Sequence, residues 1–258
     1  MRRLTTLVLV SLAACSGSTP PKDVADIPAD APRETPKACL HDGIVLCLAF
    51  EDSFLDEVSD DDGPNDLDAT LGPGLLAFNR ETERAANIHA GADVHLESRD
   101  AFDGLTGAMS FDAWVRWSPA SEQQVVLENQ NQFSLIIRPS LLGPGETFIV
   151  CGIVVTGNPQ GQEFPGAVAD QPTDGDWHHI ACVSDGSIIS AFVDGEKRVD
   201  GDRSALGPNF VDGMKDLQIG RPSDATDRPF VGQVDNVRVW NRALTLEEID
   251  RFRSGNED

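Results

Sequence analysis

Carboxylates are the most numerous groups in this sequence that could do chemistry. The 258 residues include 43 Asp and Glu against 20 Lys and Arg, which gives a formal net charge of −23. The carboxylates are densest in residues 51–68, EDSFLDEVSDDDGPNDLD, where no basic residue occurs. Such a run is typical of a solvated loop extended by self-repulsion, but it also offers the oxygen ligands that calcium takes. The acidic balance predicts no nucleic-acid partner, because a phosphate backbone would repel this chain.

Histidine and tryptophan are the next candidates. His178 and His179 are adjacent in an apolar run, so on a strand their side chains point to opposite faces and cannot share one metal ion. Trp117 ends an alternating segment just before Ser118 and Pro119. Because an indole face can stack on a sugar ring, we take Trp117 as the candidate ligand-binding residue, with core packing as the alternative.

The sequence contains no arrangement typical of an enzyme. No G-x-S-x-G motif occurs, and the acidic string at residues 247–250 falls in a segment with helical spacing, where acidic groups face solvent. Glycoside hydrolysis needs two carboxylates that converge to about 5–10 Å. No strand pattern in this chain predicts such a pair, so we expect no catalytic residue and no enzymatic activity.

The cysteines predict two disulfides. Apart from Cys15, the chain has Cys39, Cys47, Cys151 and Cys182, which can pair in three ways. In the segment CLHDGIVLC, a three-residue turn over residues 42–44 would place the two cysteines opposite each other, whereas a two-residue turn would offset them by one residue. The other two cysteines lie in strand-like runs. We therefore predict Cys39–Cys47 and Cys151–Cys182 bridges. A zinc site is disfavoured, because no pair has C-x₂-C spacing.

The N-terminal segment predicts export. Arg2 and Arg3 precede an apolar run at residues 4–14, which is too short for a bilayer span of about 20 residues but suits a secretory signal. The run ends in Leu-Ala-Ala-Cys, residues 12–15, which resembles the bacterial lipoprotein cleavage box. This resemblance implies a lipid on Cys15, and Ser16 implies the outer membrane, on its periplasmic face or at the cell surface. The alternative is an ordinary signal peptide cleaved nearby.

Three segments are therefore predicted. Residues 1–14 form the signal peptide, residues 15–37 the lipidated cysteine and a Pro-rich tether, and residues 38–258 one domain. An extended tether, at about 3.1 Å per residue, would hold the domain up to about 70 Å from the membrane. Two or more acyl chains would be a stable anchor for this acidic chain.

Short apolar runs separated by turn residues predict an all-β fold. In FDAWVRW, residues 111–117, Phe111, Ala113, Val115 and Trp117 alternate with polar or larger residues, which is the period of a strand with one buried face. An Asp-Gly pair at residues 194–195 predicts a hairpin turn. Helical spacing occurs over residues 243–252, with Leu244, Leu246, Ile249 and Phe252 on one side. The pattern predicts a two-sheet antiparallel jelly-roll sandwich with one short C-terminal helix.

Two segments carry a resemblance to a known family. Residues 177–199, WHHIACVSDGSIISAFVDGEKRV, and residues 232–252, GQVDNVRVWNRALTLEEIDRF, resemble the laminin-G-like, concanavalin A-like jelly roll, and the resemblance extends over residues 44–253. It implies that Trp114, Trp177 and Trp240 are core aromatics. It also implies a structural calcium ion between the first and last strands, held by Asp52 and Asp235. The alternative is that Asp235 simply marks a β-bulge.

The resemblance implies a non-catalytic binding domain for a glycan or an envelope or extracellular protein, anchored by the lipid on Cys15. One alternative is a glycoside hydrolase or lyase of the same fold, although the E-x-D-x-x-E strand of laminarinase-type hydrolases is missing from this sequence. A second alternative is a structural envelope lipoprotein without a soluble ligand.

Overall fold

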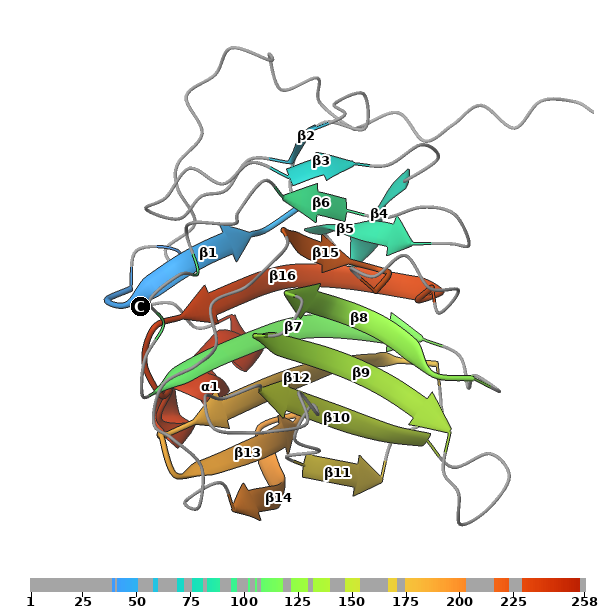
Figure 1. Ribbon diagram of the computed structural model, residues 1–258. Coiled ribbons are helices and arrows are strands. Elements are labelled where there is room, and N and C mark those ends of the chain that lie inside the picture. Colours follow the sequence, from blue (N-terminus) through green and yellow to red (C-terminus); the bar gives the residue numbers. More distant parts are fainter. Residues whose placement is uncertain are drawn as a thin grey trace, which may run out of the picture. The chain divides into compact units, whose positions relative to one another are not determined.

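The described part of the chain is a two-sheet β-sandwich (Figure 1). This computed structural model describes residues 39, 41–50, 58–59, 69–71, 76–80, 83–88, 94–96, 102, 105, 108–117, 122–129, 132–139, 147–153, 167–170, 175–202, 216–222 and 229–255. All of them fall within one compact unit, residues 34–258. The predictions for residues 1–37 lie outside the described residues.

The first sheet, here called sheet A, is built around its longest strands, β7 and β16. Its strands pair antiparallel. In spatial order they are β14 (Glu196–Asp202), β13 (Ile188–Val193), β12 (Trp177–Ser184), β7 (Met109–Trp117), β16 (Gly232–Trp240), β5 (Glu83–Ile88) and β4 (Leu76–Arg80). In addition, β1 (Ile44–Leu48) pairs with the C-terminal half of β16.

The second sheet, sheet B, faces the first across the core. In spatial order its strands are β11 (Ala167–Asp170), β10 (Thr147–Ile153), β9 (Phe133–Pro139), β8 (Gln124–Asn129), β15 (Leu217–Ile219), β6 (Val94–Leu96), β3 (Ala69–Leu71) and β2 (Val58–Ser59). Its named strands also pair antiparallel. The predicted fold class is therefore confirmed.

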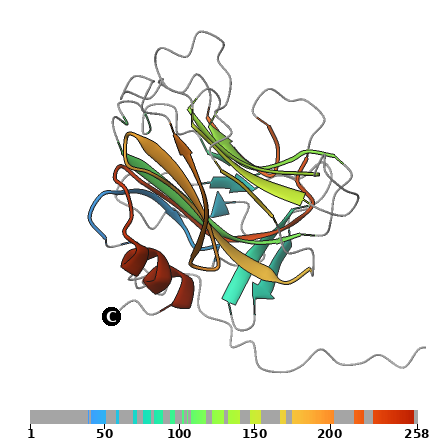
Figure 2. The same ribbon diagram turned by 90° about the horizontal axis from the view of Figure 1, so that it is seen from below.

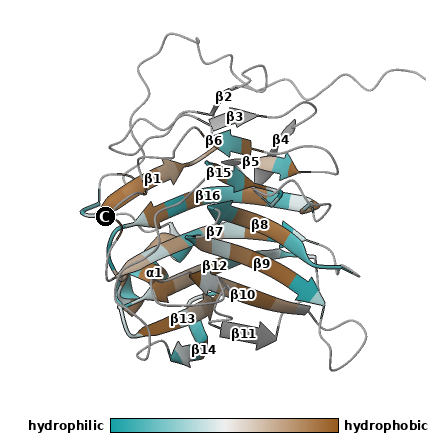
Figure 3. Ribbon diagram, viewed as in Figure 1, coloured by the Kyte–Doolittle hydropathy of each residue, from teal (hydrophilic) through white to brown (hydrophobic). Residues whose placement is uncertain are grey.

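Alternating apolar residues fill the space between the sheets. On β7, Phe111, Ala113, Val115 and Trp117 are buried in the main core cluster, as the sequence period predicts. Apolar residues are also dense along β1, β9 and β10 (Figure 3). Because each strand directs every second side chain inward, the residues between them face the outer side of their sheet.

Both predicted disulfides are present. Cys151 of β10 and Cys182 of β12 join the two sheets through the core. Cys39 bonds to Cys47 of β1, but Cys39 does not lie in a strand, so the expected hairpin between them does not form. A turn instead brings the two together, with Ile44 N–H donating to the His41 carbonyl. The predicted Asp-Gly turn is present between β13 and β14, with Asp194 and Gly195 both at positive φ.

The helix α1 (Leu246–Ser254) covers part of the outer face of sheet A (Figure 2). It starts later than the predicted residue 243, because Thr245 and Glu248 form a capping box that fixes the first turn. Ile249 and Phe252 pack on Trp240, whereas Leu246 is 61% exposed and was wrongly predicted to be on the buried side. No helix among the described residues is long and apolar enough to span a membrane.

Candidate functional site

The outer face of sheet A is buried at one end and partly exposed at the other. At one end, which we call the α1 end, the helix and the Cys39–Cys47 segment bury the row that contains Trp240. At the other end, side chains of four neighbouring strands are partly or fully exposed. We call this second set the outer strip. It consists of Asn87, Trp114, Arg116, Trp177 and Gln233.

Strand register places the outer strip on one surface. Arg116 of β7 lies opposite Trp177 of β12 on one side and Gln233 of β16 on the other. Gln233 in turn lies opposite Asn87 of β5. Directly paired residues of antiparallel strands point to the same face, so four strands contribute one continuous row of side chains. Trp114 is two residues before Arg116 on β7 and therefore shares this face.

Arg116 is held in place although it is exposed. Its Nε donates to the Gly175 carbonyl at 2.7 Å, and its Nη1 donates to Gln233 Oε1 at 3.4 Å. Close packing under this residue requires glycine at position 232, since a Cβ there would collide with the Arg116 carbonyl oxygen and the Phe230 ring. The guanidinium is thus oriented before any ligand arrives, which reduces the side-chain entropy lost on binding.

The two tryptophans of the strip correct the expectation drawn from the resemblance. Trp114 and Trp177 were predicted to be core residues, and both are instead partly exposed. Trp240 is fully buried, as predicted. The strand period of residues 111–117 already placed Trp114 on the face opposite to the core.

Trp117 also requires correction. Its side chain is only 3% exposed, and its ring contacts His178 at a centroid distance of 5.6 Å. The indole therefore lies in the core and cannot present a face to a sugar. The physical reason is the strand alternation, which puts Trp117 on the same side as Val115.

A buried charge network lies under the α1 end. Arg238 of β16 donates to Asp112 through Nε at 3.1 Å and Nη2 at 2.8 Å, and His179 Nε2 donates to Asp112 Oδ2 at 2.7 Å. Burial raises the pKa of Asp112, but the charge of Arg238 and the hydrogen bond from His179 outweigh it and lower the pKa below its ordinary value. Asp112 therefore remains ionised and fully partnered, which is the condition for tolerating a buried carboxylate.

The neighbouring histidine has a separate partner, as the opposite-face prediction requires. His178 Nδ1 donates to Asp194 Oδ2 at 2.8 Å, and the His179 backbone N–H donates to Asp194 Oδ1 at 3.0 Å. Burial raises the pKa of Asp194, and the hydrogen bonds from His178 and His179 overcome this and lower it. Both histidines therefore serve to fix strand β12 against its neighbours.

Asp235 lies at a β-bulge. The register between β16 and β7 shifts between Asp235 and Arg238, and Asn236 adopts a positive φ of 49°. The Asp235 carboxylate is fully buried, and its Oδ1 accepts a hydrogen bond from Asn236 N–H. Its predicted partner, Asp52, lies outside the described residues. Within the described ranges, no three His, Cys, Asp or Glu side chains gather as a metal site would require.

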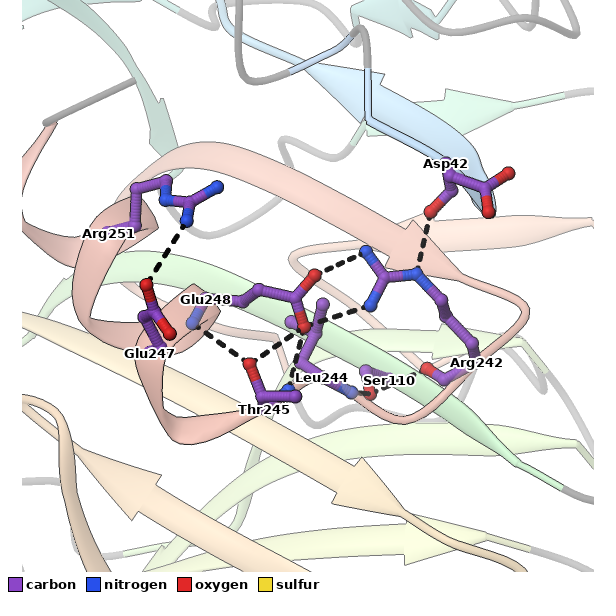
Figure 4. A network of polar contacts seen from close by, with 8 residues as sticks. All are labelled: Asp42, Ser110, Arg242, Leu244, Thr245, Glu247, Glu248 and Arg251. Atoms are coloured by element: carbon purple, nitrogen blue, oxygen red, sulfur yellow. Dashed lines mark hydrogen bonds and ion pairs between the residues drawn. The ribbon is translucent and has the colours of Figure 1, made fainter. Parts of the chain in front are cut away.

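The carboxylates of α1 have structural partners. Glu248 accepts from Arg242 Nη1 at 2.9 Å and from the Thr245 backbone N–H at 2.8 Å (Figure 4). The other two carboxylates pair with arginines of the same helix, Glu247 with Arg251 and Asp250 with Arg253. This agrees with the expectation that residues 247–250 form a solvated helix face.

The fold and the sequence together define a class of protein. The family model described as the concanavalin A-like lectin/glucanases superfamily, Laminin_G_3, matches residues 89–250. This match covers more than half of the chain, so the chain belongs to this family. It begins later than the predicted extent of residues 44–253 but includes strands β7 to β16.

Individual relatives were also found. Human Pentraxin-4 is 25% identical over 202 residues, covering 72% of this chain. The chain spans 37% of the length of this curated relative.

Solved structures share the fold. Domain 4 of AbnA, an extracellular arabinanase from Geobacillus stearothermophilus solved with arabinotriose, superposes with a TM-score of 0.57 at 17% identity, over 81% of this chain and 98% of that one. The binding domain of botulinum neurotoxin DC, solved with SialylT, gives a TM-score of 0.60 at 11% identity, over 83% and 52% of the two chains. At these identities the likeness concerns the fold.

Proposed function

We propose that this chain is a non-catalytic binding domain that recognises a glycan through the outer strip. The observation that supports this is the strip itself. One row across the strands combines the partly exposed Trp177 indole, the oriented Arg116 guanidinium and the amides of Gln233 and Asn87, and the partly exposed Trp114 indole lies in the next row. Indole faces stack on the apolar faces of sugar rings, and amides and guanidinium donate to hydroxyls. The solved relatives support this reading, since domain 4 of AbnA was crystallised with arabinotriose.

The lipoprotein prediction completes the proposal. A lipid on Cys15 and a tether over residues 15–37 would hold the domain at the outer membrane, and Cys39 enters the fold at the α1 end rather than at the outer strip. Binding by the strip would then leave the anchored end unobstructed. Labelling of the full chain with an alkyne fatty acid tests the proposed lipid on Cys15, since Cys15→Ser should abolish the label.

A glycan-binding experiment tests the main proposal. The full chain, purified in detergent, is run in native gels that contain polysaccharides of plant, bacterial and animal origin. The affinity for each polysaccharide that retards the chain is then measured by calorimetry. We expect Trp177→Ala to weaken binding at least tenfold. Phe148→Ala is the matched control, because Phe148 is a partly exposed aromatic residue on sheet B. Equal retardation of both variants, or no retardation by any polysaccharide, would reject the outer strip as a glycan site.

Two other outcomes would favour the alternatives. Capture of one envelope protein that depends on Trp177 would indicate a protein ligand in place of the glycan. Release of reducing ends from a polysaccharide, lost when a carboxylate pair is changed, would indicate a hydrolase or lyase.

We also propose calcium as a structural ligand that involves Asp235. A fully buried carboxylate beside a backbone bulge is the type of oxygen ligand that calcium takes, with Asp52 as the proposed second ligand. Calcium at 100 times its dissociation constant should stabilise the folded state by about 2.7 kcal/mol relative to EDTA. Thermal unfolding with calcium and with EDTA checks this. Asp52→Asn should remove the difference, and equal melting temperatures for the unmodified chain would exclude the site.

A further inference from the structure

Arg116 differs from most of the arginines and lysines whose contacts are described, although Arg221 also donates to a neutral group, the amide oxygen of Gln218, at 3.2 Å. Six described cations each contact a carboxylate: Lys197 with Asp200, Arg198 with Glu196, Arg238 with Asp112, Arg242 with Glu248, Arg251 with Glu247 and Arg253 with Asp250. Arg116 instead donates to a backbone carbonyl and an amide oxygen, both neutral. In a chain with a net charge of −23, a cation without an acidic partner in the described part of the structure stands out.

The surroundings of Arg116 suit a negatively charged group on a sugar. The contacts occupy Nε and Nη1, and a guanidinium has five N–H donors, so donors remain for a carboxylate. Trp177 lies directly across from Arg116, and directly paired residues have Cβ atoms about 4.5–5.5 Å apart, so a sugar ring on the indole would lie beside the guanidinium. Gly175, whose carbonyl fixes Nε, has open space where a side chain would be.

Charge also limits the ligand. Asp176 is exposed next to Trp177. This carboxylate and the acidic domain would repel a densely charged polyanion, with a screening length of about 8 Å at physiological salt. A ligand with one carboxylate per sugar ring matches a single guanidinium better than a heavily sulfated chain.

We propose that the outer strip binds a uronic-acid saccharide, with the sugar ring on Trp177 and its carboxylate on Arg116. This rests on the proposed glycan-binding function and names the ligand class for the same surface. Arginine, with its planar fork, fits a carboxylate with two parallel hydrogen bonds, which lysine cannot reproduce.

The test compares each acidic probe with its neutral form. Binding of the full chain to oligogalacturonate and oligomannuronate, and to the methyl esters of both, is measured by calorimetry. We expect esterification to weaken binding at least tenfold, because it removes the charge and one acceptor oxygen. Arg116→Gln should remove this preference, and Arg116→Lys should restore it only in part. Arg198→Gln is the matched control, since Arg198 is an exposed arginine of sheet A that contacts Glu196.

The outcomes separate this inference from the proposed function. Equal affinity for acid and ester, or an acid preference that persists in Arg116→Gln, overturns the uronate proposal. If neither uronate binds but a neutral polysaccharide binds in a Trp177-dependent manner, the uronate proposal fails and the glycan function stands. If dextran sulfate, a sulfated glucan that contains no uronic acid, binds more tightly than both uronates through Arg116, the charged group is a sulfate and the proposal is also overturned.

Discussion

The two ends of the outer face of sheet A use the same strands for opposite purposes. At the α1 end, β7 and β16 contribute Asp112 and Arg238, which are buried and bonded to each other. Four residues further along β7, Arg116 is exposed and contacts neutral groups. Four residues along a strand correspond to about 13 Å at 3.3 Å per residue. Over this distance, the outer face of sheet A changes from buried to exposed.

The difference shows that burial under the helix, rather than residue type, decides whether a charged side chain stabilises the fold or is available to a ligand. Under α1, an ion without a partner would be costly, so each charge is matched and the network serves stability. On the outer strip, water solvates Arg116, and an unmatched cation costs little there. Such a cation is available to a ligand. The ring contact between Trp114 and His179, at 5.5 Å between centroids, is where the two regions meet.

The largest effect is expected from breaking the buried pair. Asp112→Asn keeps the shape of the side chain but leaves Arg238 without an anionic partner, and removal of one partner of a buried pair typically costs about 3–5 kcal/mol. The free energy of unfolding, measured by urea denaturation at pH 7, should fall by this amount. The exposed pair of Lys197 and Asp200 is the control, since Asp200→Asn should cost at most about 1 kcal/mol. Equal losses in the two variants would contradict the comparison.

The strands could be predicted from the sequence, but the burial of one end of the outer face of sheet A by α1 could not. The period of residues 111–117 correctly places Phe111, Ala113 and Val115 toward the core, because alternation is a local property of a strand. The same period implies that Trp117 is buried, and the surface role assigned to it from its place at the strand end was wrong. The burial of Asp112 depends on α1, which lies more than a hundred residues later, and no local pattern contains that information.

The disulfides and the outer strip illustrate the same limit. The Cys39–Cys47 pairing is predictable because the two cysteines are 8 residues apart, so few geometries are available to the segment. The outer strip brings together β5, β7, β12 and β16, and its register is set by the whole sheet. One signal for it was present in the sequence, since alternation places Trp114 and Arg116 together on the face away from the core.

A smaller effect is expected at the start of α1. The hydrogen bond from Arg242 and those from Thr245 lower the pKa of Glu248 from 4.5 to about 2, although partial burial opposes this. A carboxyl whose pKa is lower in the folded state contributes stability above its unfolded pKa, and this is lost as the pH falls. The free energy of unfolding should therefore fall between about pH 4.5 and pH 2, and less steeply in Glu248→Gln. At pH 7 this variant should lose about 1 kcal/mol with the capping box. Glu247→Gln is the control, because the Glu247 side chain is 87% exposed. This variant should change neither the free energy of unfolding at pH 7 nor its dependence on pH.

The smallest effect is expected at the open end. Arg116→Gln removes a solvated cation whose contacts are to neutral acceptors, so the free energy of unfolding should change by no more than about 0.5 kcal/mol. Urea denaturation of this variant beside Asp112→Asn measures the contrast directly, because both changes replace a charged side chain of β7 with an amide. A loss above about 2 kcal/mol for Arg116→Gln would mean that Arg116 holds the Gly175 loop and Gln233 in place as a structural element. A near-zero change means that any loss of ligand binding in the same variant reports a contact with the ligand rather than damage to the fold.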